Sequence, residues 1–473
     1  MSSIYISAAH KSSGKTTLSI GLARVLRDRG IALQTFKKGP DYIDPLWLSA
    51  ASGRSCYNLD FYTQSREEIA NCFSARMQGR EMALIEGNKG LFDGLDIEGS
   101  NSNAAMAAFL STPVILVINC RGMTRGIAPL LLGYQAFDDQ IDIAGVILNQ
   151  IGGNRHESKL REVVEYYTDI PVLGAVHADE RLQIDERHLG LMPSNEAEQS
   201  ELVIRYLADA VRTSVDVDRI LEIAAKGPLP APTSLQNALK SPAGTGVRIG
   251  YAKDRAFGFY YPDDLERMQN LGATLIPFDT LNDSYLPDID GIFLGGGFPE
   301  TAMEALESNR AMRQAIAEFI ETGGAVYAEC GGLMYLTRSL SWRGKQCRMV
   351  GIIPADTVMH EKPQGRGYVQ LRDRGTGPWP TSKGLSSEAV ISAHEFHYSS
   401  LSSFESERGE FAFEVLRGTG IDGRHDGYVY KNLLASYTHM RSVGGNDWVE
   451  RFVNHVRTCK SAQPVNDDKV TDV

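Results

Sequence analysis

The sequence predicts an α/β protein with two doubly wound domains. Short apolar and β-branched segments, typical of buried strands, alternate with segments whose apolar residues recur at helical spacing. Such alternation indicates largely parallel sheets with helices on both faces. A stretch rich in Pro, Ser and Gly at 226–246 separates two such series, and 473 residues suffice for two or three domains.

The first predicted domain spans residues 1–225 and holds a parallel sheet. Helices are expected between its strands, including "REEIANCFSARM", "RHESKLREVVEYY" and a segment from Thr16 that Gly30 ends. The expected strands are 4–9, 32–36, 82–87, 113–120, 143–151 and 171–176.

The second predicted domain spans residues 247–460 and follows the linker 226–246. We expect one long helix over 300–322 and a closing helix at "DWVERFVNHVRTC", after which the polar tail 461–473 is expected to be disordered. The expected strands are 247–254, 273–278, 290–297, 325–332, 389–398, 410–417 and 427–440.

Composition excludes several classes of function. A net charge of -11 argues against sequence-independent nucleic-acid binding, which needs a basic face. The six cysteines form no CxxC pair, so neither a disulfide framework nor a zinc ribbon is expected. No apolar run approaches the length of a membrane helix, and no secretory leader is recognised. We therefore expect a protein of the reducing cytoplasm that binds no membrane.

A phosphate-binding loop is predicted at "HKSSGKTT", between the first strand and the first helix. Backbone N–H groups at a helix N-terminus form an anion site, Lys15 reaches the β/γ-phosphates of ATP, and Thr16 ligates Mg²⁺. Ala9 replaces the usual first glycine and Lys11 is an extra lysine, as in deviant loops where that lysine contacts phosphates, often across subunits. Such a role would imply a homodimer. The predicted ATP-binding residues of the loop are Lys11, Ser12, Ser13, Gly14, Lys15, Thr16 and Thr17.

Carboxylates following two strands are candidate Mg²⁺ ligands beside Thr16. Asp41 follows the second strand and Glu86 ends the third, and the carboxyl ends of parallel strands share one edge of the sheet. A turn-stabilising role is the alternative for any single Asp in a Gly/Pro turn, and Asp93 in "FDG" is the clearest such case.

Further charged residues in loops at this edge are expected to meet an anionic substrate. For any one lysine or arginine among them, a solvated surface role is the alternative. The predicted substrate-binding residues are Lys38, Asp44, Lys89, Asp93 and Arg125.

Cys330 in "AVYAECGGLMYLT" is a candidate nucleophile. It follows a predicted strand and precedes a helical segment in a glycine-flanked turn, the arrangement of a nucleophile elbow. A helix N-terminus lowers a thiol pKa, and a histidine base is required, for which His439 in "ASYTHM" is the choice. Most cysteines are structural, but the glycines favour the nucleophile. The predicted oxyanion-hole residues are Gly295, Gly296, Gly297 and Gly331.

The motifs together resemble the cobyrinate a,c-diamide synthases. "KSSGKTT", "KKGPDYIDP", "EGNKGLFDG", "GVILNQIGGNRH", "GGGFPE", "YAECGGLMYL" and "HEFHYS" carry the similarity over nearly the whole chain. The resemblance implies a dethiobiotin-synthetase-like ATP-dependent amide ligase joined to a class I glutamine amidotransferase-like sheet. It implies that Cys330 releases ammonia from glutamine, and that ATP activates the a and c acetate carboxylates of a tetrapyrrole for amidation, forming ADP. Asn149 then resembles the adenine-side asparagine.

The resemblance leaves alternatives open. Related enzymes act on sirohydrochlorin, its nickel form or siroheme, and a distant alternative is a nucleotide-switch ATPase with an inactive second domain. Amidotransferases of this class carry a glutamate two residues after the histidine, where this chain has Arg441. We therefore expect a Cys330–His439 dyad with no assigned partner for the histidine. His394 and His397 lie three apart on a predicted strand, on opposite faces, and form a poor metal-chelating pair.

Overall fold

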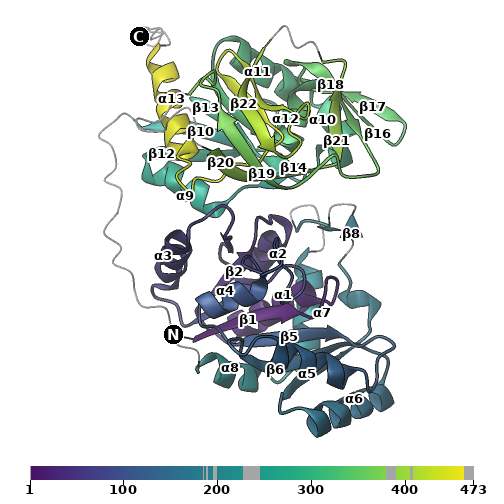
Figure 1. The fold of residues 1–473 in the computed structure, drawn as a ribbon. Helices are drawn as coiled ribbons and strands as arrows, with labels where there is room; N and C mark the ends of the chain where they lie inside the picture. Colours follow the sequence, from purple (N-terminus) through teal and green to yellow (C-terminus); the bar gives the residue numbers. More distant parts are fainter. Residues whose placement is uncertain are drawn as a thin grey trace, which may run out of the picture. The chain divides into compact units, whose positions relative to one another are not determined.

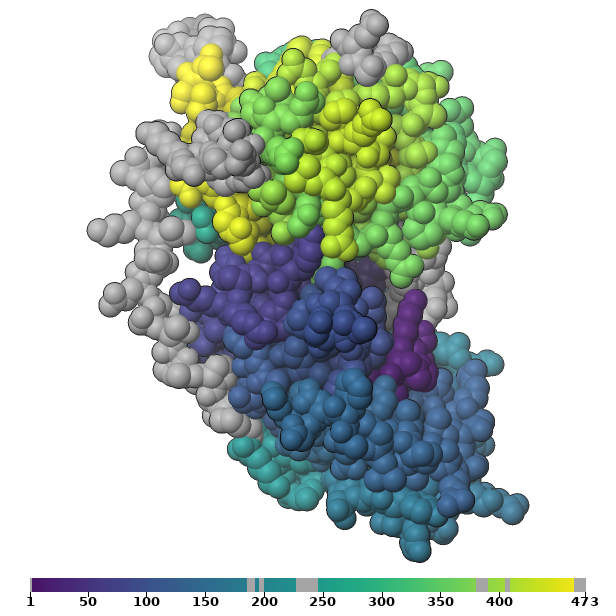
Figure 2. All heavy atoms as spheres, in the orientation of Figure 1, coloured from purple at the N-terminus to yellow at the C-terminus, as the bar shows by residue number. Residues whose placement is uncertain are grey.

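The computed structural model describes residues 2–184, 186–187, 190–194, 200–226, 246–379, 390–404 and 409–462. It divides into two compact units, Met1–Gln236 and Asn237–Val473, drawn from purple to teal and from teal to yellow (Figures 1 and 2). Nearly all of the predicted linker (227–245) and tail (463–473) lies outside the described residues. Within the described residues, each helix is too short or too polar to cross a lipid bilayer.

The first unit is built on a seven-stranded sheet in the order β3-β2-β4-β1-β5-β6-β7. Every neighbouring pair of these strands is parallel, as the alternation of strands and helices predicts. β1 lies at the centre, so the loop that follows it opens at the middle of the carboxyl edge. The strands are β1 Ser2–Ala8, β2 Leu33–Lys38, β3 Tyr57–Leu59, β4 Met82–Glu86, β5 Val114–Asn119, β6 Ile143–Ile151 and β7 Val172–His177.

Two helical layers cover this sheet (Figure 1). Ile4 and Ile6 of β1 belong to one apolar core and Tyr5 to the other, because successive strand residues point to opposite faces. The first core receives α1 Lys15–Asp28, α2 Ile43–Ser52, α7 Ser200–Ser214 and α8 Val217–Ala224. The second receives α3 Arg66–Met77, α4 Asn103–Phe109, α5 Ile127–Phe137 and α6 Asn154–Tyr167. The short elements η1 Glu180–Leu182, β8 Glu186–Arg187 and β9 Gly190–Leu191 complete this unit.

The second unit holds a nine-stranded mixed sheet in the order β12-β10-β13-β15-β24-β23-β22-β19-β20. The pairs from β12 to β24 are parallel and the rest are antiparallel. The strands are β10 Val247–Ala252, β12 Ala273–Phe278, β13 Gly291–Leu294, β15 Ala325–Glu329, β19 Gly365–Asp373, β20 Val390–His397, β22 Glu410–Arg417, β23 His425–Tyr430 and β24 Leu433–Ser436.

Helices cover both faces of this sheet too. One apolar core receives α9 Pro262–Asn270 and α13 Trp448–Ala462. The other receives α10 Met303–Ser308, α11 Arg310–Glu321 and α12 Gly331–Leu336. Two smaller sheets join β11 Phe257–Phe259 to β14 Gly296–Gly297, and β17 Lys345–Arg348, β16 Thr337–Trp342, β18 Ile353–Met359 and β21 Ser399–Ser402 in that order.

Several predicted boundaries in the second unit are wrong. The expected helix over 300–322 is divided into η2 Pro299–Ala302, α10 and α11, because Asn309 leaves helical geometry and its side chain caps α11 at Met312 N, 3.2 Å away. The expected strand 427–440 is a hairpin of β23 and β24. The helix α13 continues through Ala462, so the first two residues of the predicted tail are helical.

Candidate functional site

The phosphate-binding loop follows β1 at the carboxyl edge of the first sheet. Gly14 has φ 91°, a conformation that glycine adopts without strain, and α1 begins at the next residue. Ser13 is fully buried and its hydroxyl donates to the His10 carbonyl at 2.8 Å, which closes the loop on itself. Lys11 and Ser12 are exposed. The loop therefore offers an anion site at the start of a long helix.

Lys15 is 7% exposed beside this loop. Burial and the neighbouring Lys37 lower the pKa of Lys15 to about 8, against the opposing effect of Glu86 and Asp44. A bound polyphosphate would supply the negative charge that this buried ammonium needs.

Thr16 opens onto a buried cluster of carboxylates. Its hydroxyl donates to Glu86 Oε1 at 2.6 Å and lies 3.3 Å from Asp44 Oδ2. Lys37 Nζ lies among the same oxygens, bonded to Asp44 and 2.9 Å from Glu86 Oε1. Burial raises the pKa of Glu86, and Lys37 opposes that shift. The predicted metal ligand Asp41 lies at the margin, with Oδ2 3.8 Å from Lys37 Nζ and Oδ1 accepting from Ile43 N at 2.9 Å.

The donor set of this cluster fits Mg²⁺. A hydroxyl and carboxylate oxygens are what Mg²⁺ prefers, and it usually takes few protein ligands because it keeps several waters. Glu86 Oε2 is buried and makes no hydrogen bond, so one carboxylate oxygen is available to a cation. Among the described residues, no group of three or more His, Cys, Asp or Glu has the geometry of a dedicated metal cage.

Glu86→Gln is expected to raise the Mg²⁺ concentration needed for half-maximal ammonia-dependent amidation by about 10-fold or more, because it removes a buried anionic oxygen beside Thr16. The measurement is a Mg²⁺ titration at saturating ATP. Glu67→Gln, at an exposed position on α3, serves as the control. A titration curve identical to that of the unmodified protein would remove Glu86 from the metal site.

Other predicted residues of the first unit lie around this centre. Asn149 at the end of β6 donates to Ser13 O at 2.9 Å, and a Cβ on Gly14 would lie 2.1 Å from its Nδ2. It therefore supports the loop backbone, and its adenine contact stays a prediction. Lys38 is 1% exposed, donates to Asn101, and has a pKa lowered by burial to about 8. Lys38 is thus enclosed, whereas Lys37 enters the carboxylate cluster.

The remaining predicted substrate-binding residues lie outside the carboxylate cluster. Asp93 Oδ2 accepts from Gly90 N at 2.9 Å, the turn-stabilising role that its sequence context allows. Its charge nevertheless opposes the lowering of the Lys15 pKa. Lys89 lies in the same loop with φ 39°. Arg125 donates to the hydroxyl of Tyr167 at 2.9 Å and is not brought into the carboxylate cluster.

In the second unit, Cys330 lies in a strained turn between β15 and α12. Its φ of 47° and ψ of -101° are costly for a residue with a side chain, and such strain concentrates at functional sites. The Cys330 N–H donates to Ser436 O at 2.7 Å, which ties the turn to β24. This is the strand-turn-helix geometry of a nucleophile elbow.

His439 lies three residues beyond the end of β24 and is held against Cys330 by contacts of its own segment. Asp426 accepts from Tyr437 N and Thr438 N at 3.0 and 2.9 Å, and His439 N donates to His394 O at 2.8 Å. The two imidazole rings stack with centroids 5.0 Å apart. Burial disfavours the charged imidazole, but a hydrogen bond with Cys330 and the charge of Glu329 outweigh it and raise the pKa of His439 to about 10. The site therefore favours the protonated imidazolium form of His439.

The glycine triplet passes beside this pair. A Cβ on Gly296 would lie 2.5 Å from His439 Cε1, and one on Gly331 would lie 3.0 Å from Gly297 N. The Gly295 N–H already donates to the Tyr260 hydroxyl at 3.0 Å. Of the four predicted oxyanion donors, the structure thus brings Gly296, Gly297 and Gly331 together and engages Gly295 elsewhere.

Gly296→Ala is expected to lower glutamine hydrolysis by about 10²-fold or more, because the new methyl group would displace the His439 ring. Glutaminase kinetics measure this, and ammonia-dependent amidation serves as the internal control. Gly344→Ala is the control variant. A Cβ at Gly344 would meet open space, but the φ of 76° strains any residue other than glycine. The unfolding temperature of this variant should therefore fall while its rate of glutamine hydrolysis is unchanged. Normal glutamine hydrolysis by Gly296→Ala would contradict the assigned geometry.

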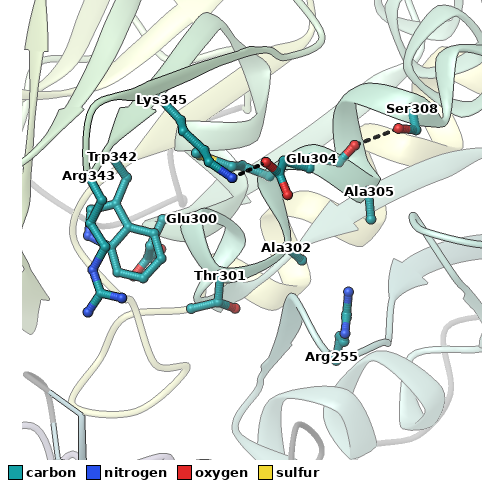
Figure 3. A pocket seen from close by; sticks show the side chains of 11 residues that line it. Arg255, Glu300, Thr301, Ala302, Glu304, Ala305, Ser308, Trp342, Arg343 and Lys345 are labelled. Carbon is teal, nitrogen blue, oxygen red and sulfur yellow. Dashed lines mark hydrogen bonds and ion pairs between the residues drawn. The ribbon is translucent and has the colours of Figure 1, made fainter.

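A separate cavity of about 480 Å³ lies on the second unit (Figure 3). Its lining includes Arg255, Glu300, Trp342 and Arg343, and Lys345 is paired with Glu304 at 2.5 Å. Neither Cys330 nor His439 lines it. It contains none of the catalytic or binding residues predicted from the sequence.

Glu329 is a neighbour of the catalytic pair that the sequence motifs do not single out. Its Oε2 lies 3.3 Å from His439 Nδ1, although the two residues are far apart in the sequence. His394, on the "HEFHY" strand, forms an isolated antiparallel bridge with His439, so this strand supports the backbone of the histidine base.

Comparisons with known proteins agree with this two-part arrangement. Residues 5–191 match the CobQ/CobB/MinD/ParA nucleotide binding domain, and residues 248–446 match the CobB/CobQ-like glutamine amidotransferase domain. Cobyrinate a,c-diamide synthase of Magnetococcus marinus is 45% identical over 450 residues, covering 94% of this chain and 95% of that protein. The proteins of the same name from Methanosarcina acetivorans and Archaeoglobus fulgidus are 41% and 39% identical, covering 93% and 95% of this chain and 92% and 96% of theirs. The chain belongs to the cobyrinate a,c-diamide synthase family.

Proposed function

We propose that this protein uses ATP and glutamine to amidate the a and c acetate carboxylates of a cobyrinate-type tetrapyrrole. The observation that carries the proposal is the Cys330–His439 pair on a strained elbow in one unit, in a chain whose other unit joins a phosphate loop to Thr16 and Glu86. The identity of 45% to a protein named cobyrinate a,c-diamide synthase supports the choice of substrate.

Glutamine hydrolysis is assigned to the second unit. The Cys330 thiolate attacks the side-chain amide carbon of glutamine, and backbone N–H groups of Gly296, Gly297 and Gly331 stabilise the oxyanion. His439 gives its proton to the leaving nitrogen, which departs as ammonia and leaves a thioester. His439 then takes a proton from water, whose oxygen attacks the thioester and releases glutamate and the thiolate.

Carboxylate activation is assigned to the first unit. The loop N–H groups, Lys11 and Lys15 hold the phosphates, and Thr16, Glu86 and the nearby Asp44 and Asp41 would hold Mg²⁺, which screens charge on the phosphates. A substrate carboxylate oxygen attacks the γ-phosphorus, giving an acyl phosphate and ADP. Ammonia attacks the acyl carbon, phosphate leaves, and the amide remains. Lys37 neutralises Glu86 and Asp44 beside this site. Lys38, Lys89 and Arg125 remain predicted contacts to more distant parts of the ring.

The test is high-resolution mass spectrometry with cobyrinate, hydrogenobyrinate, sirohydrochlorin, its nickel form and siroheme offered in parallel with Mg·ATP and glutamine. Each amidation replaces a hydroxyl by an amino group, so the products report both the ring and the number of amides. Two amidations of cobyrinate are expected. Preference for another ring would transfer the same chemistry to that substrate, and no glutamine hydrolysis with any ring would overturn the proposal. Size-exclusion chromatography with light scattering tests the homodimer that the exposed Lys11 suggests.

A further inference from the structure

Arg441, two residues after His439, cannot serve as the missing acidic partner of the histidine. Its guanidinium is 2% exposed and donates to Asp263 Oδ2 from Nη2 at 2.7 Å and from Nε at 3.1 Å. It also lies over the Tyr261 ring, with Cζ 5.0 Å from the centroid. The Arg441 guanidinium is therefore paired with the Asp263 carboxylate of α9.

Glu329, in contrast, supplies an acidic contact to the histidine. It is 2% exposed, and Oε2 lies 3.3 Å from His439 Nδ1. Its other oxygen accepts from Met440 N at 2.9 Å and from the Tyr327 hydroxyl at 2.5 Å. Because two groups besides the imidazole fix this carboxylate, its position does not depend on the histidine it faces.

The strained turn explains how consecutive residues reach one ring. In a regular strand, Glu329 and Cys330 would point to opposite faces of the sheet. The φ of 47° at Cys330 departs from the strand geometry that β15 keeps through Glu329. The turn therefore allows the thiol and the carboxylate to address the same imidazole, with Nδ1 facing Glu329 and Nε2 left for the thiol.

We propose that Glu329 is the positioning residue of the glutaminase site, holding His439 in the tautomer and orientation that let its Nε2 exchange a proton with Cys330. The proposal rests on the proposed glutaminase role of Cys330 and His439. Glu329 touches neither the substrate nor the reacting sulfur in this scheme, and it acts through the histidine. In this chain, an acidic residue directly before Cys330 thus takes the role that other amidotransferases of this class give to a glutamate two residues after the histidine.

The charges around the imidazole agree with this role. Burial, His439 and Arg441 hold the pKa of His394 well below its usual value, so the stacked ring is neutral. Arg441 is paired with Asp263, and burial with Asp263 raises the pKa of Asp264, whose Oδ1 accepts from Ser442 N. Tyr327 and Tyr260 have pKa values raised by burial and remain neutral. Glu329 is the carboxylate whose contact with the ring stabilises the imidazolium.

The test is Glu329→Gln, which keeps the shape of the side chain. Its amide carbonyl can still accept from Met440 N, but its NH₂ donates to Nδ1 and leaves the proton of neutral His439 on Nε2, the wrong nitrogen for a base. We expect kcat for glutamine hydrolysis to fall by about 10²- to 10⁴-fold with little change in the glutamine KM. Ammonia-dependent amidation should stay at the rate of the unmodified protein.

The pH dependence of thiol alkylation separates positioning from a structural role. Glu329 favours the charged imidazole, so its removal lowers the pKa of His439 and makes proton transfer from Cys330 less favourable. The iodoacetamide reaction of Cys330 should therefore slow at pH 7, and its midpoint should move to higher pH. Glu329→Asp keeps the charge and should recover part of the rate, which keeps the proposal testable should the glutamine variant fail to fold.

Glu395→Gln is the matched control, because Glu395 is also 2% exposed and accepts from Thr419 N and Gly420 N in the same unit. Its alkylation profile should be unchanged. Unaltered kcat and an unaltered alkylation profile in Glu329→Gln would overturn the inference and leave the proposed function intact. Glutamine hydrolysis by Cys330→Ser would instead overturn the proposed function itself.

Discussion

Cys330→Ser is expected to abolish glutamine-dependent amidation while ammonium salts still support the reaction. The strained turn presents this thiol to His439, whose raised pKa suits it to accept the proton of the thiol. A serine hydroxyl at the same position has no comparable tendency to ionise. The loss of glutamine hydrolysis should be about 10⁴-fold or more, as expected when a nucleophile is removed from a cooperating set.

Glutamate release and amide formation should be measured in the same samples. Cys347→Ser is the control, because Cys347 is also buried in the second unit but lies on β17, away from the elbow. It should keep both activities. Loss of ammonia-dependent amidation together with glutamine use in Cys330→Ser would contradict the division of labour between the two units.

Much of the first unit could be predicted because its local signals agree with its packing. The segment "REEIANCFSARM" forms α3 over its full length, and Ser65 and Glu68 make the reciprocal hydrogen bonds of a capping box at its start. The strands of this sheet are buried on both faces, so they appear in the sequence as continuous apolar segments. The order of the strands depends on long-range pairing, which the sequence pattern does not contain.

The second unit was less predictable where side chains, not periodicity, set the boundaries. The segment 300–322 has helical spacing, but the Asn309 side chain caps a new helix and breaks it. Half-buried strands such as β16 and β19 carry polar and charged residues that mask their alternation. Such strands form because neighbouring strands pair with them, a tertiary effect.

The candidate sites show the same division between local and tertiary information. Cys330 and the phosphate loop have local motifs and could be found in the sequence. Lys37 and Lys38 are adjacent, and nothing in the sequence distinguishes their roles. Because successive residues of β2 point to opposite faces, Lys37 contacts the carboxylate cluster and Lys38 contacts Asn101. The contact between Glu329 and His439 joins residues 110 positions apart, so no local pattern predicts it.

Lys15→Ala is expected to lower ATP-dependent amidation by about 10²- to 10³-fold or more with either glutamine or ammonia as nitrogen source. Lys15 is 7% exposed at the phosphate loop, and burial and Lys37 lower its pKa to about 8. A phosphate oxygen within reach would raise this pKa again and be stabilised in return. Glutamine hydrolysis at Cys330 should persist, because that site is built entirely from the second unit.

Product formation and ATP affinity by calorimetry are the measurements, with Lys159→Ala on the exposed face of α6 as the control. Since Lys37 already neutralises Glu86 and Asp44, the loss in Lys15→Ala should appear in phosphate binding and transfer and leave the melting temperature nearly unchanged. Unimpaired amidation by this variant would show that the loop does not hold the reacting phosphates.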